Sequence, residues 1–128
     1  MKLKLIGLFI IIMSNGCSEN VNNSPIILIA AINSGPGATI LTFHADSTVE
    51  WISGMFSSPQ NGRYKIIDSL INIEGIKLER ALKSEHLLLT RKNPINRNLN
   101  DLILLQINQN REIIDSNLIF KITVDNRK

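Results

Sequence analysis

The residues best suited to bind a metal lie in two short segments about 40 residues apart. His44 and Asp46 stand two positions apart, and His86 follows Glu85. Histidine and carboxylate side chains are ligands for zinc, so four such groups in one place would form a site. Nothing in the spacing indicates that the two segments meet, and both histidines are expected at the surface beside strand ends. We therefore predict neither a metal site nor a cofactor.

Other catalytic groups lack the spacing that their chemistry needs. A serine nucleophile requires a base and an orienting acid within reach, yet no serine lies in a Gly-x-Ser-x-Gly turn. Paired carboxylates support glycoside hydrolysis, and the candidate pairs are Asp68 with Glu74 and Asp46 with Glu50. Carboxylates in turns and on solvent-facing strand positions are equally ordinary, so neither pair indicates catalysis. The Ser-Gly-Pro-Gly segment at 34–37 lacks the lysine of a phosphate-binding loop. We therefore expect a protein that is not an enzyme.

The single cysteine, Cys17, closes a segment with the composition of a secretory signal. Lys2 and Lys4 give a positive start, an apolar run follows over residues 5–13, and small or polar residues end it. The run is less than half of the ~20 residues that a membrane-spanning helix needs. We therefore predict a signal peptide over residues 1–16.

A cysteine directly after Gly16 resembles the lipobox of bacterial lipoproteins. The resemblance implies that Cys17 becomes the new N-terminus and carries a diacylglyceryl thioether, so that the bilayer is the protein's first partner. Ser18, where an aspartate would signal retention, favours the outer over the inner membrane of a two-membrane bacterium. The alternative is an ordinary secreted protein with an unmodified thiol.

The remaining chain has nearly balanced charge and the length of one domain. Removing residues 1–16 from the 128 leaves 112 residues with 12 basic and 11 acidic groups, because Lys2 and Lys4 leave with the signal. The densest basic cluster is Arg91-Lys92, with Arg97 nearby. Such a chain offers no basic patch for nucleic acid. With Cys17 acylated no thiol remains, so an apolar core alone must hold the fold together.

Short β-rich segments dominate the body of the chain. The polar residues 18–24 are expected to form a flexible tether from Cys17, and residues 25–128 a single β domain. The isoleucine-rich run 26–32 has the length of a strand. Two hairpins are predicted from period-two alternation, over 39–44 with 48–52 and over 63–67 with 70–74.

Further strands are predicted over 87–90, 102–107, 112–114 and 118–124, with 102–107 and 112–114 paired. One helix is predicted over 77–85, because Leu78, Ala81 and Leu82 share a face. About eight short strands at regular spacing predict an all-β fold, an antiparallel meander that forms a small barrel or a sandwich. A barrel has the advantage that it leaves no open edge.

Two stretches resemble the small lipocalin-like lipoproteins, which repeat an F-x-x-D-G-T hairpin followed by G-x-Y-x-I-x-x-x-x-L. They are Thr-Phe-His-Ala-Asp-Ser-Thr-Val at 42–49 and Gly-Arg-Tyr-Lys-Ile-Ile-Asp-Ser-Leu-Ile at 62–71, with Ser47 in place of the glycine. The resemblance implies a β-meander, a fold that can enclose a small cavity, and it implies neither an activity nor a ligand. A cavity lined by Phe43, Tyr64 and Phe120 would favour a carrier of a small apolar ligand.

The connection 53–62 is the candidate contact region. It is longer than the usual two to five residues of a hairpin loop and contains Met55 and Phe56. These side chains either cap an open barrel end or contact a partner or ligand, whereas Trp51 is expected in the core. We expect a non-catalytic, lipid-anchored envelope lipoprotein that acts as a binding or structural module. The alternative is an envelope inhibitor or immunity protein that blocks a toxin or lytic enzyme with this loop.

Overall fold

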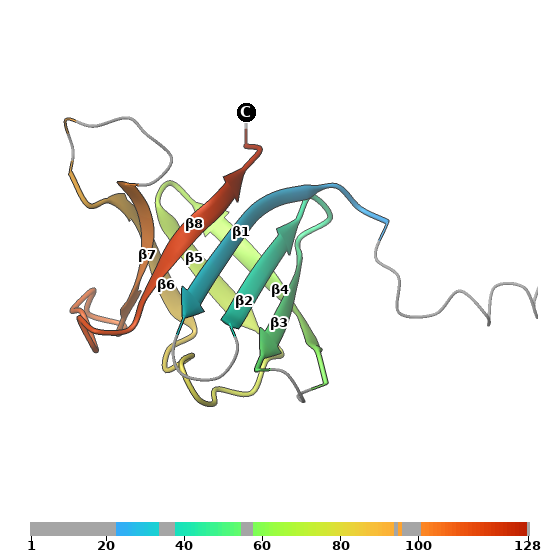
Figure 1. Cartoon of the computed structure of the whole chain (residues 1–128), viewed down its shortest axis with the longest axis horizontal. Coiled ribbons are helices and arrows are strands. Elements are labelled where there is room, and N and C mark those ends of the chain that lie inside the picture. The colour runs from blue at the N-terminus through green and yellow to red at the C-terminus, as the bar shows by residue number, and fades with distance from the viewer. Residues whose placement is uncertain (1–22, 34–37, 55–57, 94, 96–100, 128) are drawn as a thin grey trace, which may run out of the picture.

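The protein folds into a closed antiparallel β-barrel (Figure 1). The computed structural model describes residues 23–33, 38–54, 58–93, 95 and 101–127. Its eight strands are β1 (Ile26–Asn33), β2 (Ala38–His44), β3 (Thr48–Ser53), β4 (Gln60–Ile67), β5 (Leu70–Glu74), β6 (His86–Arg91), β7 (Leu102–Ile107) and β8 (Ile119–Asp125). Each strand pairs with the next, and β8 returns to pair with β1. The predicted all-β meander is confirmed, and it closes as a barrel.

Alternate residues along most of the strands fill the barrel, as the period-two pattern predicts. Strand β7 differs, since Leu102, Ile103 and Leu104 are all buried. In β8, Phe120 and Ile122 are buried, whereas Lys121 between them is exposed. Trp51 of β3 is 1% exposed and meets Phe120 edge to face, with ring centroids 6.1 Å apart. The prediction that Trp51 belongs to the core is therefore confirmed.

The tight turns depend on particular backbone conformations. Ser47, in the turn between β2 and β3, has a φ of 70°, which is the left-handed region that glycine adopts most readily. Asp68 has a φ of 55° between β4 and β5. Gly62 of β4 serves a different need, because a Cβ there would lie 2.3 Å from the backbone oxygen of Glu74. A side chain at position 62 would therefore force β4 and β5 apart.

The barrel has two ends, which we name as they lie in Figure 1. The upper end carries residues 23–25, the turns 45–47 and 68–69, residues 92–93 and the C-terminal residues 126–127. The lower end carries residues 75–85 and 108–118, together with the described ends of the other two connections. The chain enters the barrel and leaves it at the upper end.

Residues 75–85 close the lower end without forming a helix, so the helix predicted over 77–85 is wrong. Ala81 and Leu82 do face the interior, being 5% and 0% exposed, but Leu78 is 39% exposed. Gln106 of β7 determines this shape. Its Nε2 donates to the Ala81 oxygen at 2.7 Å, and its Oε1 accepts hydrogen bonds from the amides of Lys83 and Ser84. These tertiary bonds satisfy backbone groups that a helix would have bonded internally.

The strand predicted over 112–114 is reduced to a single bridge between Ile107 and Ile113. Asn108 explains why, since its Oδ1 accepts hydrogen bonds from the amides of Asn110 and Glu112. Arg111 takes a φ of 65° within this turn. The side chain of Asn108 thus shapes residues 108–112 into a compact loop and ends the pairing.

Candidate functional site

The first described residues are fixed to the upper end of the barrel. His44, the last residue of β2, is 6% exposed, and its Nδ1 lies 2.9 Å from the carbonyl oxygen of Ser24. The Ser24 hydroxyl oxygen accepts a hydrogen bond from the amide of Asp46, and the Ala45 amide donates to the Pro25 oxygen at 2.8 Å. The expectation that His44 lies at the surface is therefore wrong, because its ring holds the incoming chain.

Tyr64 supports the same contact from β4. Its hydroxyl donates to the backbone oxygen of His44 at 2.6 Å, and its ring meets Phe43 edge to face at 5.0 Å. Burial raises the pKa of the Tyr64 phenol, and the charge of Asp46 adds to the effect. The phenol therefore stays protonated and acts as a donor that locks the end of β2.

The histidines and carboxylates do not assemble a metal site. His86 begins β6 toward the lower end, where its Nδ1 lies 2.7 Å from Oδ1 of Asn72, far along the barrel from His44. The Asp46 carboxylate accepts hydrogen bonds from the hydroxyl and amide of Thr48, and the hydroxyl bond in particular lowers its pKa. Among the residues that the structure describes, no group of three or more His, Cys, Asp or Glu side chains could hold a metal ion.

A cleft of about 510 Å³ opens at the upper end, beside the C-terminal residues. Leu89 and Leu102 give it an apolar surface. Thr90 and Ser69 add hydroxyl groups, and the remaining lining comes from two cations. The full lining set is Ser69, Leu89, Thr90, Arg91, Leu102 and Arg127. This combination suits an anionic group attached to an apolar body.

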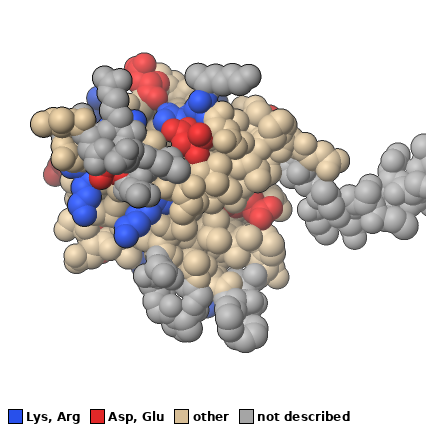
Figure 2. All heavy atoms as spheres, turned by 45° about the horizontal axis from the view of Figure 1, so that its top comes forward, with Lys and Arg blue, Asp and Glu red and all other residues tan. Residues whose placement is uncertain are grey.

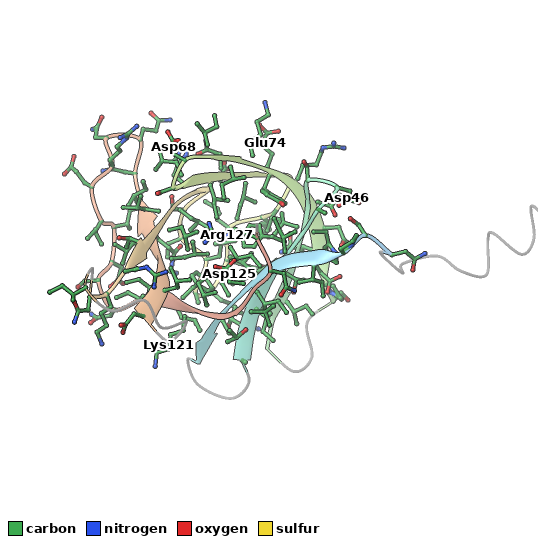
Figure 3. The ribbon with its side chains drawn as sticks, turned by 90° about the horizontal axis from the view of Figure 1, so that it is seen from above. Asp46, Asp68, Glu74, Lys121, Asp125 and Arg127 are labelled. Atoms are coloured by element: carbon green, nitrogen blue, oxygen red, sulfur yellow. The ribbon has the colours of Figure 1, made fainter. Side chains whose placement is uncertain are left out.

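An ion pair holds one of the two cations in place. Arg127 contacts Asp125 through two bonds, Nε to Oδ1 at 2.8 Å and Nη2 to Oδ2 at 3.0 Å. These bonds lower the pKa of Asp125, and the positive charge of Arg91 lowers it further. The same bonds raise the pKa of Arg127. Figure 3, which looks down on the upper end, shows Asp125 and Arg127 side by side near the middle, with Asp46 and Asp68 farther out.

The barrel interior is filled around the three residues that would line the cavity of a carrier. Phe43 and Phe120 have no exposed surface, and Tyr64 is 6% exposed. A space large enough for water would give its lining residues accessible surface, so none adjoins the two phenylalanines. Leu41, Leu104 and Leu82 are likewise 0% exposed. A cavity of the kind that a lipocalin-like fold can enclose is therefore absent from this part of the core.

The lower end carries exposed apolar side chains of its own. Ile113 and Ile114, in the connection between β7 and β8, are 52% and 46% exposed. The connection between β3 and β4 leaves the barrel at Gly54 on this same end (Figure 1). Two exposed isoleucines are too few to identify a partner, but they place apolar surface away from the end where the chain enters.

The three site residues predicted from sequence, Cys17, Met55 and Phe56, lie outside the described residues. The upper cleft was not predicted. Arg91 stood out as part of a basic pair, but nothing in the sequence associates it with Arg127 or Ser69, because the ends of β6 and β8 come near one another only when both strands pair with β7.

Comparisons with known proteins leave the chain without relatives to reason from. No protein-family model matches it, and no curated protein and no solved structure is significantly similar. No helix within the described ranges is long and apolar enough to cross a membrane. The function must therefore be argued from the residues and their geometry.

Proposed function

We propose that the protein is a non-catalytic lipoprotein of the bacterial cell envelope, anchored through acylated Cys17, whose barrel acts as a binding or structural module. The outer membrane is the favoured location, because Ser18, and not an aspartate that would signal retention in the inner membrane, follows Cys17. The observation that carries the proposal is the filled core around Phe43 and Phe120, which leaves no room for a ligand in that part of the barrel. Any binding must then use the outer surface or the ends.

The position of Ser24 supports anchoring through the N-terminus. Hydrogen bonds from His44 and Asp46 hold this residue at the rim of the barrel, outside the packed core. A lipid on Cys17 would therefore not compete with the packing of the core. The same contacts leave the lower end free to face other molecules.

Membrane fractionation of a Cys17→Ala variant tests the proposal. Because Cys17 is the only cysteine, this change removes the acylation site and no other thiol. The two acyl chains of the diacylglyceryl group give stable attachment where one chain is marginal, since each buried methylene contributes ~0.8 kcal/mol. The unmodified protein should sediment with membranes and the variant should become soluble. Equal membrane fractions for the two proteins would refute anchoring through Cys17.

The second candidate is an inhibitor or immunity protein that blocks a toxin or lytic enzyme. It is favoured by one observation, the exposed Ile113 and Ile114 at the end opposite the tether, where the connection containing Met55 and Phe56 also begins. Phe56→Ala should then abolish capture of an envelope partner while the melting temperature stays nearly unchanged. The matched control is Ile67→Ala at the upper end, which should retain the partner. Loss of stability with no change in capture would instead assign Phe56 to capping the barrel.

A further inference from the structure

The length of the tether relates the upper end of the barrel to the bilayer. Seven steps of the chain separate Cys17 from Ser24, which span about 25 Å when fully extended and about 15 Å as a flexible coil. A strand of eight residues, such as β1, is about 26 Å long and rises about 20 Å along the axis of a barrel when tilted by ~40°. As a coil the tether is shorter than this rise, so a lipid on Cys17 would hold the upper end nearer to the membrane than the lower end.

The upper end presents an apolar tip where this geometry would bring it to lipid. Ile67, at the end of β4, is 64% exposed, and the adjacent Ile66 is 37% exposed. Both lie in the last two strand pairs before the turn at Asp68, at the rim of the barrel, and their side chains point to opposite faces of β4. An exposed pair of isoleucines at a hairpin tip is costly in water and favourable at the boundary between headgroups and acyl chains.

The cleft of Arg91 and Arg127 lies directly beside this tip. Ser69 of the hairpin turn lines the cleft, and its backbone oxygen accepts a hydrogen bond from the Leu89 amide at 2.7 Å. A guanidinium group has five N–H donors, of which the bonds to Asp125 use two on Arg127. Guanidinium groups match the geometry of phosphate oxygens and bind them through paired hydrogen bonds.

The rest of the charge at this end does not form a broad basic patch. Among the described residues in Figure 2, acidic and basic side chains lie intermixed over the left half of the visible face, whereas the right half is mostly uncharged. Attraction to a lipid phosphate would therefore come from the cleft itself. An apolar tip next to a single cationic cleft is a surface suited to lipid, which offers phosphate and hydrocarbon within one molecule.

We propose that the upper end is a second membrane contact, in which Ile66 and Ile67 enter the headgroup region and the Arg91–Arg127 cleft receives a lipid phosphate. This inference rests on the proposed anchoring through Cys17. It adds that the barrel docks on the bilayer in one orientation instead of moving freely on its tether. The lower end, with Ile113 and Ile114, then faces away from the membrane.

Site-specific quenching tests the orientation on the lipidated full-length mature protein. Acylation occupies Cys17, so an introduced cysteine is the single free thiol. A polarity-sensitive fluorophore is placed at Ile67→Cys, and at Ile114→Cys as a matched isoleucine on the opposite end. In vesicles of phosphatidylcholine and phosphatidylglycerol containing spin-labelled lipid, quenching should be several-fold stronger at position 67. Equal quenching, or stronger quenching at 114, would overturn the inference.

Arg91→Gln tests the cleft in the same vesicles. One arginine near an anionic surface contributes ~1 kcal/mol, which is about a fivefold change in the docking equilibrium, so quenching at position 67 should fall. Lys83→Gln, an exposed cation at the lower end, is the control and should leave quenching unchanged. Equal effects of the two substitutions would refute a role for the cleft.

Anchoring through Cys17 and docking of the upper end can be refuted separately. If the unmodified protein does not sediment with membranes, anchoring through Cys17 fails, and docking fails with it. If the protein sediments but position 67 is no more quenched than position 114, only the docking inference fails.

Discussion

Replacing Gln106 by leucine would test how the lower end of the barrel is closed. The side chain is 0% exposed and bonds to four backbone groups, of Ala81, Lys83, Ser84 and Leu118. Ala81 and Ser84 are themselves 5% exposed, so water cannot replace these two bonds. Leucine has a similar volume but can bond to neither group.

The expected loss follows from the two buried partners. Each unsatisfied buried group costs ~1–3 kcal/mol and burial of the leucine returns ~1 kcal/mol, so Gln106→Leu should lower the free energy of unfolding by about 3 kcal/mol. The other two partners, the Lys83 amide and the Leu118 oxygen, lie nearer to solvent, so losing their bonds adds less to the loss of stability. The change should also loosen residues 75–85, because three of the four hydrogen bonds of the Gln106 side chain are made to Ala81, Lys83 and Ser84 within this segment.

Urea unfolding of the chain from residue 18 onward would measure the loss. Trp51 is the single tryptophan and is 1% exposed, so its fluorescence reports directly on the core. Gln109→Leu provides the control, since Gln109 lies exposed in the neighbouring turn and the same substitution there should change stability by less than ~0.5 kcal/mol. A loss at Gln106 below 1 kcal/mol, or equal to that at Gln109, would refute the reasoning.

Three further predictions concern other parts of the barrel. Phe120→Ala should cost ~3–5 kcal/mol and Lys121→Ala less than ~0.5 kcal/mol in the same unfolding assay; comparable losses would contradict the inward–outward alternation of β8. Gly62→Ala should cost ~1–3 kcal/mol, because its Cβ would meet backbone at 2.3 Å, and a neutral result would refute that close approach. Asp125 has a lowered pKa in the folded state, so its contribution is present above about pH 4 and lost below it; Asp125→Asn should remove this part of the acid sensitivity, and an unchanged stability–pH curve would exclude it.

Period-two alternation predicted most of the barrel because each strand has one buried and one exposed face. The hairpin predicted over 39–44 and 48–52 corresponds to β2 and β3 within one residue at each end. Its turn forms although Ser47 stands in the place of glycine, with the left-handed φ that a glycine would have adopted. Local patterning was sufficient here because the strands are neighbours in sequence.

The same method failed where distant residues decide the local structure. The spacing of Leu78, Ala81 and Leu82 fits a helix. The side chain of Gln106 in β7 instead forms hydrogen bonds with the backbone of this segment and holds it in a non-helical conformation. The start of β4 at Gln60 was missed because Gln60 and Asn61 are polar, and their strand conformation comes from pairing with β3. Contacts of this kind have no local signature.

The candidate site was even less predictable than the fold. The burial of His44 depends on Ser24, twenty residues earlier in the chain. The upper cleft depends on residues from position 69 to position 127, which meet only when the strands between them have paired. The lipid-anchoring prediction is different in kind, because it rests on a contiguous motif around Cys17 that needs no tertiary structure.

Mass spectrometry of the N-terminal peptide of the membrane-extracted protein tests the central claim most directly. Anchoring through Cys17 predicts that the mature chain begins at this residue, with residues 1–16 removed, and that its sulfur carries a diacylglyceryl group. When the thioether is cleaved, the mass of the N-terminal peptide should decrease by the mass of one diacylglyceryl group. A mature chain that begins elsewhere, or a Cys17 with an unmodified thiol, would contradict the account.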